Sequence, residues 1–271
     1  MIDRREIELL RSLLRSDAGA PSSALIEQLD GDASVLQTVI ESLERDGYRF
    51  ENLGANIRLE SEPDAVRPQS VGARLTTQIF GREIYVFRET TSTNDLARRA
   101  GIGKASEGVV FFAEQQTAGR GTQGRNWVSQ ANQGLWFSIL LRSTLAVDRL
   151  PALVQMAALA TAEAAERWIE HPIHIKPPND LVLAGGKLAG FLLETSNAWN
   201  FQILGIGINV RSAPQIEGYP TSALEGFSKS RIQLAELAAQ VLNRFEEWYL
   251  RKPIESVIAA FASRVGQAPG R

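Results

Sequence analysis

A short connection between two apolar segments constrains the fold of the second half of this chain. Gly185-Gly186 lies between residues 181–184 and 187–194, and both flanking segments are largely apolar. Two adjacent glycines are typical of a tight β-hairpin turn, because glycine readily adopts positive φ angles. A hairpin joins antiparallel strands, whereas parallel strands need a long crossover. The sheet is therefore predicted to be mixed and largely antiparallel, without a regular alternation of strand and helix.

Hydrophobic periodicity predicts the other elements of this region. Strands are expected at residues 84–88, 108–114, 135–141, 173–175, 181–184, 187–194 and 201–210. Helices are expected at residues 94–100, about 149–169 and about 231–250, where apolar residues recur at helical spacing. The sequence thus predicts an α+β fold in which helices flank the sheet.

The first sixty residues have a different pattern, that of a small helical unit. Three helices and then a hairpin are expected at residues 6–15, 24–29, 32–46 and 48–59. This order is the outline of a winged helix-turn-helix domain. A polar stretch with two prolines follows and is typical of a linker. We therefore expect a winged-helix-like domain, a linker and a larger domain at residues 1–62, 63–75 and 76–265.

Composition excludes several kinds of chemistry. The chain has no cysteine, which removes disulfides, thiolate zinc sites and cysteine thioester intermediates. Its two histidines supply little for catalysis or metal binding by imidazole. We see neither a secretory signal nor a run of roughly 18 apolar residues, so a cytoplasmic protein without membrane spans is expected.

Residues 115–127, QQTAGRGTQGRNW, place three glycines among two arginines. Backbone amides and guanidinium groups are both available there to a phosphate or a carboxylate. The pattern Gly-x-Gly-x-x-Gly occurs at residues 119–124, but no helix-forming apolar segment follows it. The dinucleotide-binding fingerprint is therefore rejected, and the segment is interpreted as an anion-binding loop.

This loop resembles the Gly-Arg-Gly-x-x-Gly-Arg-x-Trp signature of biotin protein ligases. Other signatures of that family are resembled in the same order by Thr91-Ser92-Thr93-Asn94, Lys176-Pro177-Pro178-Asn179-Asp180, Gly186-Lys187-Leu188-Ala189-Gly190 and Gly205-Ile206-Gly207-Ile208-Asn209. The resemblance implies a class II synthetase-like catalytic domain and the activity of a biotin--[acetyl-CoA-carboxylase] ligase. Such an enzyme uses ATP and Mg²⁺ to form biotinoyl-5'-AMP and transfers biotin to a lysine of a biotin carboxyl carrier protein.

Positive charge is needed where the carboxylate of biotin approaches the α-phosphate of ATP. Lys187, Arg120 and Arg125 supply it, and Lys187 is expected to be the main catalytic residue because a hairpin holds its ammonium group rigidly. The absence of cysteine fits a reaction without an enzyme nucleophile. It argues against the related octanoyl transferases, which use a cysteine thioester.

The uncharged ureido ring of biotin calls for neutral donors and acceptors. By chemistry and by resemblance, the expected biotin-binding residues are Ser92, Thr93, Asn94, Gln116, Gly119, Arg120, Gly121, Lys187 and Gly190. The expected ATP-binding residues are Arg125, Trp127, Asn179, Asp180 and Asn209. Asp180 is also expected to hold Mg²⁺ or to orient Lys187.

Three departures from the family pattern bear on activity. Thr122 and Gln123 stand where many members carry basic residues, and from this we expect weaker retention of the adenylate. Pro177 replaces a tryptophan and removes an aromatic wall and a backbone donor. The residues after Phe261 are too few for the small C-terminal β-barrel of bacterial members, so that module is expected to be absent.

The charge of the N-terminal domain argues against DNA binding, although longer family members with a winged helix act as repressors. Residues 1–60 contain seven arginines, no lysine and twelve acidic residues, a net charge of −5. Phosphate neutralisation supplies most of the affinity of such domains, so weak or no operator binding is expected. The alternatives are a biotin-responsive repressor with weak ligase activity, a lipoate or octanoate ligase on the same scaffold, and a non-catalytic binding protein. A homodimer is possible.

Overall fold

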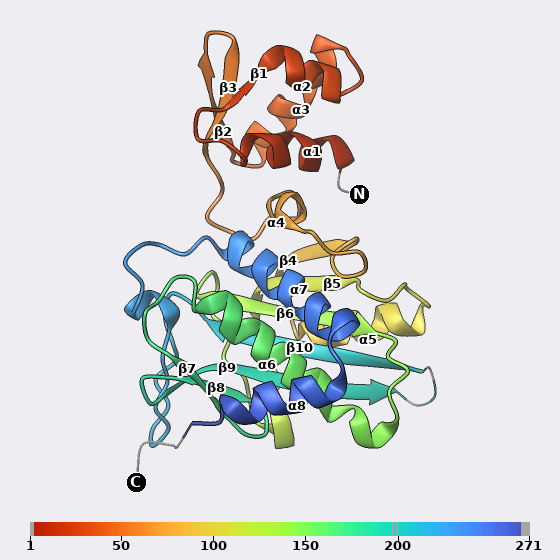
Figure 1. Cartoon of the computed structure of the whole chain (residues 1–271), viewed down its shortest axis with the longest axis vertical. Helices are drawn as coiled ribbons and strands as arrows, with labels where there is room; N and C mark the ends of the chain where they lie inside the picture. Colours follow the sequence, from red (N-terminus) through yellow and green to blue (C-terminus); the bar gives the residue numbers. More distant parts are fainter. Residues whose placement is uncertain (1–2, 197, 199, 267–271) are drawn as a thin grey trace. The chain divides into compact units, whose positions relative to one another are not determined.

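The computed structural model describes residues 3–196, 198 and 200–266, and the chain divides into two compact units (Figure 1). The first unit spans residues 1–74 and the second spans residues 75–271. The segment 63–75, expected to be a linker, is not irregular throughout, because it contains helix α4 (Pro68–Arg74). Proline is favourable at the first position of a helix, where its missing N–H needs no partner, and Pro68 begins α4 in this way.

The first unit has the predicted order of three helices and a hairpin. Its helices and strands are α1 (Arg4–Leu13), β1 (Ala20–Pro21), α2 (Ser22–Gln28), α3 (Ala33–Arg45), β2 (Arg49–Leu53) and β3 (Asn56–Ser61). The strands pair in the order β1-β3-β2. Leucines from all three helices form the core, together with the buried ring of Tyr48. Asp32 caps α3 by accepting a hydrogen bond from the backbone N–H of Ser34, at 2.8 Å.

Helix α4 packs within this first unit. The guanidinium group of Arg11 donates hydrogen bonds to the carbonyl oxygens of Gly72 and Ala73, at 3.0 and 3.3 Å. Gly72 lies so close to Ile7 that an added Cβ would be 2.8 Å from the Ile7 side chain. These contacts replace a loose connection by a fourth packed helix.

A seven-stranded sheet forms the centre of the second unit, with strand order β4-β5-β6-β10-β9-β8-β7. Its strands are β4 (Ile84–Thr90), β5 (Val110–Gln116), β6 (Gly134–Leu141), β7 (Ile173–Lys176), β8 (Asp180–Leu183), β9 (Gly186–Ser196) and β10 (Phe201–Asn209). β4 and β5 are parallel, and every other pairing is antiparallel. The prediction of a mixed, largely antiparallel sheet is confirmed.

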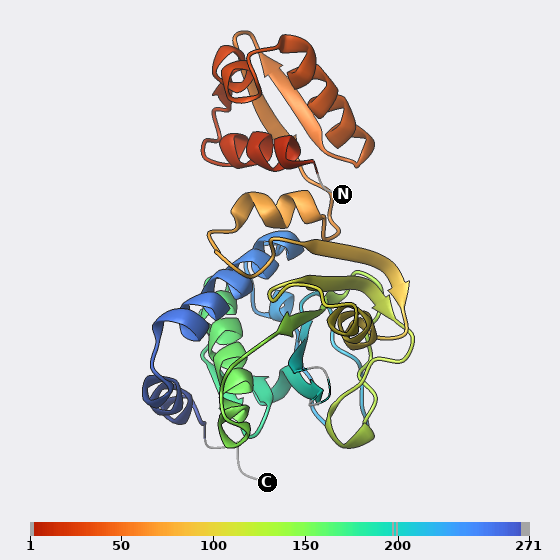
Figure 2. The same ribbon diagram turned by 90° about the vertical axis from the view of Figure 1, so that its right-hand side faces the viewer.

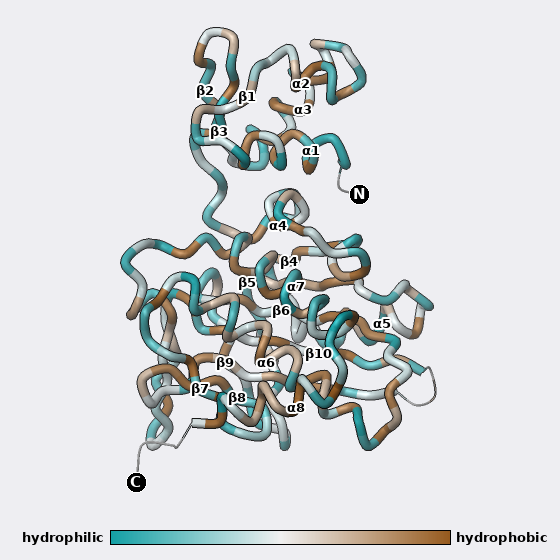
Figure 3. Tube along the Cα trace, in the orientation of Figure 1, coloured by the Kyte–Doolittle hydropathy of each residue, from teal (hydrophilic) through white to brown (hydrophobic). Residues whose placement is uncertain are grey.

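Helices cover both faces of this sheet, as Figure 2 shows. α6 (Pro151–Ala165) and α7 (Leu234–Arg251) lie on one face, and α5 (Thr93–Ile102) lies on the other. Every residue of β6 is buried, as expected for a strand covered on both faces. Apolar segments accordingly run along the central strands (Figure 3). Helix α8 (Ile254–Ser263) was not predicted, and α6 ends earlier than expected.

No helix in the described ranges, 3–196, 198 and 200–266, has both the length and the apolar character that a membrane crossing requires.

The hairpin between β8 and β9 turns one residue earlier than predicted. Its turn residues are Ala184 and Gly185, with φ angles of 49° and 83°, and Gly186 already pairs with Leu183 as the first residue of β9. Gly186 is needed for a different reason, since an added Cβ would lie 2.6 Å from the carbonyl carbon of Thr221. This close approach fixes the strand immediately before Lys187.

Candidate active site

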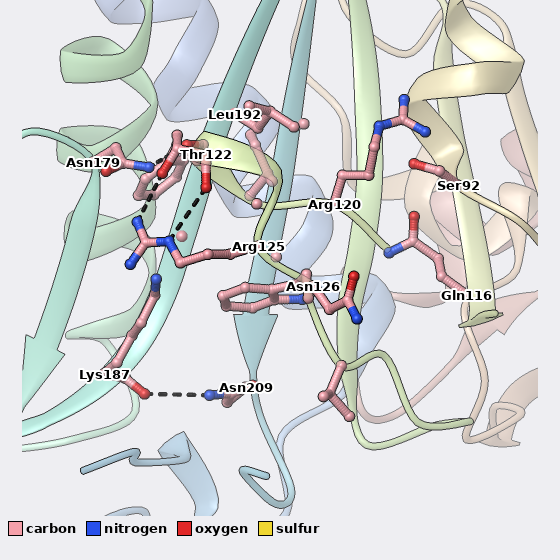
Figure 4. A pocket seen from close by; sticks show the side chains of 18 of the residues that line it. Ser92, Gln116, Arg120, Thr122, Arg125, Asn126, Asn179, Lys187, Leu192 and Asn209 are labelled. Carbon is pink, nitrogen blue, oxygen red and sulfur yellow. Dashed lines mark hydrogen bonds between the residues drawn. The ribbon is translucent and has the colours of Figure 1, made fainter. Parts of the chain in front are cut away.

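A cavity of about 350 Å³ lies in the second unit, over β9 and β10 and beside the start of α5 (Figure 4). Twelve of the residues expected to form the site line it: Ser92, Thr93, Asn94, Gln116, Arg120, Gly121, Arg125, Trp127, Asn179, Lys187, Gly190 and Asn209. The expected residues Gly119 and Asp180 do not line it. Segments far apart in the sequence therefore meet around one space.

Lys187 occupies one end of the cavity, on β9. Its Nζ atom lies 2.7 Å from Oδ1 of Asp180, and the two side chains are only 16% and 10% exposed. The hydroxyl of Tyr219 donates a hydrogen bond to the other oxygen of Asp180, at 3.0 Å. Burial, with the nearby Asp180 carboxylate as a second cause, raises the pKa of Tyr219. The phenol therefore stays protonated and can keep donating to Asp180.

These partners bear on the magnesium site expected at Asp180. One oxygen of this carboxylate faces Lys187 and the other accepts from Tyr219. Within residues 3–196, 198 and 200–266, no cluster of three or more acidic, histidine or cysteine side chains is placed to hold a metal ion. The observed geometry fits a carboxylate that orients Lys187, which is one of the two roles expected for Asp180.

The expected anion-binding loop, residues 115–127, folds into a narrow hairpin between Gly119 and Trp127. The N–H of Trp127 donates to the carbonyl of Gly119 at 2.8 Å, and the N–H of Gly121 donates to the carbonyl of Arg125 at 2.7 Å. Gly119 must lack a side chain, because an added Cβ would lie 2.4 Å from the carbonyl oxygen of Trp127. Gly119 is therefore buried beneath the loop and shapes it without facing the cavity.

Arg120 is held by two carboxylates that the sequence did not associate with it. Its guanidinium group lies 2.8 Å from Asp95 and 3.4 Å from Glu194. The hydrogen bond with Arg120 lowers the pKa of Asp95, and the same bond raises the pKa of Arg120. In Figure 4 the Arg120 guanidinium points away from Lys187 and toward the side of Ser92. Arg120 thus lines the same cavity as Lys187 but from the side of Ser92, and its two ion pairs hold the loop in place.

Arg125 lies at the Lys187 end of the cavity (Figure 4). Its guanidinium group donates to the carbonyl oxygen and to the hydroxyl of Thr122, at 3.2 and 2.9 Å. The residue is exposed, and both acceptors belong to its own loop. Arg125 is consequently the loop arginine whose side chain can reach an anion next to Lys187.

Trp127 lies directly on the sheet. Its indole ring would be 2.5 Å from a Cβ added at Gly207 and 2.9 Å from one added at Gly190. The ammonium group of Lys187 lies 5.2 Å from the ring centroid. The glycines of β9 and β10 thus make room for an aromatic ring that faces Lys187.

The other end of the cavity carries neutral polar side chains beside Arg120, whose charge is paired with Asp95 and Glu194. Ser92 is the N-cap of α5, and its hydroxyl accepts from the backbone N–H of Asn94. Gln116 is fixed at both ends of its amide: its oxygen accepts from the Thr93 N–H at 2.8 Å, and its nitrogen donates to Ser129 Oγ at 2.7 Å. Such an arrangement of neutral groups suits a neutral polar ring.

Asn179 and Asn209 fasten the strands that carry Lys187. The Asn179 amide donates to the carbonyl of Phe191 at 2.7 Å, and the Asn209 amide donates to the carbonyl of Lys187 at 3.2 Å. Both residues are almost fully buried. These bonds support a structural role beside the nucleotide-binding role that the sequence predicted for them.

Sequence reasoning missed several residues of this site: Asp95, Ser129, Ser138, Glu194 and Tyr219. Asp95 comes three residues after the N-cap Ser92. An acidic residue at this spacing is common at a helix start, so the pattern did not indicate that Asp95 pairs with Arg120. Ser138 lies within the apolar strand β6, where its hydroxyl was the one available signal. Tyr219 comes from a loop without a recognisable pattern.

The segment that carries most of the site residues also matches a known protein family. Residues 86–210 match the biotin/lipoate A/B protein ligase family. The biotin--[acetyl-CoA-carboxylase] ligase of Mycobacterium tuberculosis is 36% identical over 196 residues, which cover 69% of this chain and 73% of that protein. The bifunctional ligase/repressor BirA of Bacillus subtilis is 31% identical over 219 residues, which cover 78% of this chain and 67% of that protein.

A solved structure has the same fold. The biotin protein ligase of Aquifex aeolicus, in complex with biotin and ATP, aligns with a TM-score of 0.59 at 29% identity. The alignment covers 68% of this chain and 78% of that one. Family match, relatives and fold agree: this chain belongs to the biotin/lipoate A/B protein ligase family.

Proposed function

We propose that this protein is an ATP-dependent biotin protein ligase, which forms biotinoyl-5'-AMP and transfers biotin to a lysine of a biotin carboxyl carrier protein. The observation that carries the proposal is a single cavity with two chemically different ends. Ser92, Thr93 and Gln116 give one end neutral hydrogen-bonding groups, beside the carboxylate-paired Arg120, and Lys187 stands at the other end. Biotin has the matching polarity, with an uncharged ring at one end and a carboxylate at the other.

The first half-reaction places two anions side by side. A carboxylate oxygen of biotin attacks the α-phosphorus of ATP, an acyl phosphate bond forms, and pyrophosphate leaves. Lys187 is positioned to lie against the carboxylate and the α-phosphate, where its ammonium group offsets their repulsion and the charge that develops in the transition state. Asp180 and Tyr219 restrict the motion of that ammonium group, and Arg125 is available to a second phosphate oxygen.

In the second half-reaction, the ε-amine of the acceptor lysine attacks the acyl carbon of the adenylate. An amide forms, AMP leaves and the amine loses a proton. The chain needs no nucleophile of its own for either step, which agrees with the absence of cysteine. Mg²⁺ would enter with ATP, held by phosphate oxygens, because Asp180 is already paired.

Naming in the relatives supports this reaction, since the Mycobacterium tuberculosis protein is a biotin--[acetyl-CoA-carboxylase] ligase and the Aquifex aeolicus structure contains biotin and ATP. Lipoate and octanoate lack an uncharged hydrogen-bonding ring, so the polar end of the cavity favours biotin over them.

The proposal is tested by incubating the protein with ATP, Mg²⁺, biotin and a biotin carboxyl carrier domain, and measuring the carrier by mass spectrometry. The expected result is one biotinoyl group on the carrier's acceptor lysine, dependent on ATP. A carrier with that lysine replaced by arginine is the control and should stay unmodified. Modification with lipoate instead of biotin, or none with either acid, would contradict the proposal.

A further inference from the structure

A buried serine on the central sheet lies behind the neutral end of the cavity. Ser138 is fully buried on β6, and its hydroxyl oxygen lies 2.5 Å from Oδ1 of Asn94 and 2.7 Å from Oγ1 of Thr93. All three side chains are buried, and Thr93 and Asn94 line the cavity while Ser138 does not. Ser138 therefore acts on the cavity through its neighbours.

The hydrogen bonds among Ser138, Asn94 and Thr93 can be assigned a donor and an acceptor each. A hydroxyl has one proton, and Ser138 donates it to the carbonyl oxygen of Asn94, which can only accept. Ser138 must then accept the proton of Thr93. The other acceptor near the Thr93 hydroxyl is Gln116 Oε1 at 3.2 Å, which already accepts from the Thr93 N–H. Both destinations of the Thr93 proton are internal, so its Oγ1 can face a ligand only as an acceptor.

Gly205 makes this arrangement possible. It pairs with Ser138 across β6 and β10, and an added Cβ would lie 2.5 Å from Asn94 Oδ1. Any side chain at this position would displace Asn94 from Ser138. The strands β6 and β10 pair regularly at this point, so strand pairing does not require a glycine. The glycine is required because α5, which carries Asn94, lies so close to the sheet.

We propose that Ser138, with Asn94 and Gly205, is a positioning residue for substrate specificity: it holds Thr93 as a hydrogen-bond acceptor, so the cavity selects an acid whose head group offers an N–H. This inference rests on the proposed function and extends it to the choice of acid. A cyclic urea such as that of biotin supplies the N–H. The dithiolane of lipoate and the alkyl end of octanoate supply none, and would leave the buried acceptor unsatisfied.

The test uses acid-dependent exchange of pyrophosphate into ATP by the full chain, with biotin and with lipoate. Ser138→Ala removes the closer of the two internal acceptors of the Thr93 proton and leaves only the longer contact with Gln116. Thr93 is then held less firmly as an acceptor, and we expect the KM for biotin to rise about tenfold, the equivalent of one ordinary hydrogen bond. The kcat with biotin should stay unchanged, because the reacting carboxylate lies at the opposite end of the cavity. The KM for lipoate should not rise, so the preference for biotin falls by the same factor.

A control and a second variant separate specificity from stability. Thr161→Val removes another fully buried hydroxyl, on α6 and away from the cavity, and should leave both KM values unchanged. Gly205→Ala is a change on β10 that pushes Asn94 away from Ser138. It should reproduce the effect of Ser138→Ala, and it provides the test if Ser138→Ala does not fold. A folded Ser138→Ala or Gly205→Ala protein with the wild-type preference for biotin would overturn the inference. No exchange by the wild type with biotin would instead overturn the proposed function itself.

Discussion

The Nζ atom of Lys187 lies 2.7 Å from Oδ1 of Asp180, on neighbouring antiparallel strands that a tight hairpin joins. The carboxylate that holds the lysine is itself held by the hydroxyl of Tyr219. These contacts restrict the flexible side chain of Lys187 to a narrow range of positions at one end of the cavity. Preorganised charge of this kind is effective because little reorganisation is needed when the reaction occurs.

Replacement of Lys187 tests its role directly. Lys187→Ala should lower kcat for biotin-dependent pyrophosphate exchange by about a hundredfold or more, the usual loss when a charge-stabilising group is removed. Lys176→Ala is the matched control, because Lys176 is exposed, does not line the cavity and lies 5.3 Å from the centroid of the same Tyr219 ring. We expect the control to keep nearly full activity. Equal losses in the two variants would refute the assignment of Lys187.

Tyr219→Phe should reduce kcat by roughly three- to tenfold, because Asp180 loses one hydrogen bond but keeps Lys187. The matched control is Tyr85→Phe on the edge strand β4, away from the cavity, which should have no effect on exchange. A Tyr219→Phe protein as active as the wild type would show that the phenol does not help to position the lysine.

The stability that Tyr219 contributes also depends on pH. Its pKa in the folded protein is raised above the ordinary value of 10.0, mainly by burial. The contribution is therefore complete below pH 10.0 and is lost as the pH rises through the folded value. Thermal melting should show a constant difference between wild type and Tyr219→Phe up to that pH and a shrinking difference above it.

Asp95→Asn should destabilise the second unit, because the Arg120 guanidinium loses its partner at 2.8 Å. The pKa of Asp95 is lowered by its hydrogen bond with Arg120, so its contribution is present above the ordinary value of 3.8 and is lost as the pH falls through the folded value. Melting curves of wild type and variant should converge in acid. Asp148→Asn, at an exposed position of the same unit, should show no such pH-dependent difference.

The sequence predicted the sheet well because its strands combine apolar alternation with short turns, as around Ala184 and Gly185. It failed at α4 and α8, both of which begin at or directly after a proline. Proline before α4 resembled linker composition, and α8 begins directly after Pro253. Helices of this length are stabilised by tertiary packing, such as that of Gly72 on Ile7, which local patterns do not contain.

Twelve of the expected site residues line the cavity, and they could be predicted because local motifs carry them. The partners of those motif residues could not. Arg120 meets Glu194 across 74 residues of sequence, and Ser138 meets Thr93 across 45. Charge pairs and buried hydroxyl contacts of this kind depend on strand order, which the sequence did not specify. The two ion pairs of Arg120 could therefore not be predicted from the sequence, and its role at the reacting atoms stays a prediction.

The acidic first unit leads to a separate prediction. With seven arginines, no lysine and twelve acidic residues in residues 1–60, it should bind duplex DNA weakly and without sequence preference. A gel-shift titration at low salt, with biotin and ATP present, measures this. Tight, sequence-selective binding of the DNA upstream of a biotin synthesis gene would show that other surfaces overcome the repulsion.

The central claim is that one cavity brings a neutral-ring acid and ATP together at Lys187. The most direct test is exchange of labelled pyrophosphate into ATP by the full chain without any carrier protein. We expect exchange that depends on biotin, is far weaker with lipoate and is nearly abolished in Lys187→Ala. Folded wild-type protein that shows no biotin-dependent exchange, or equal exchange with both acids, would contradict it.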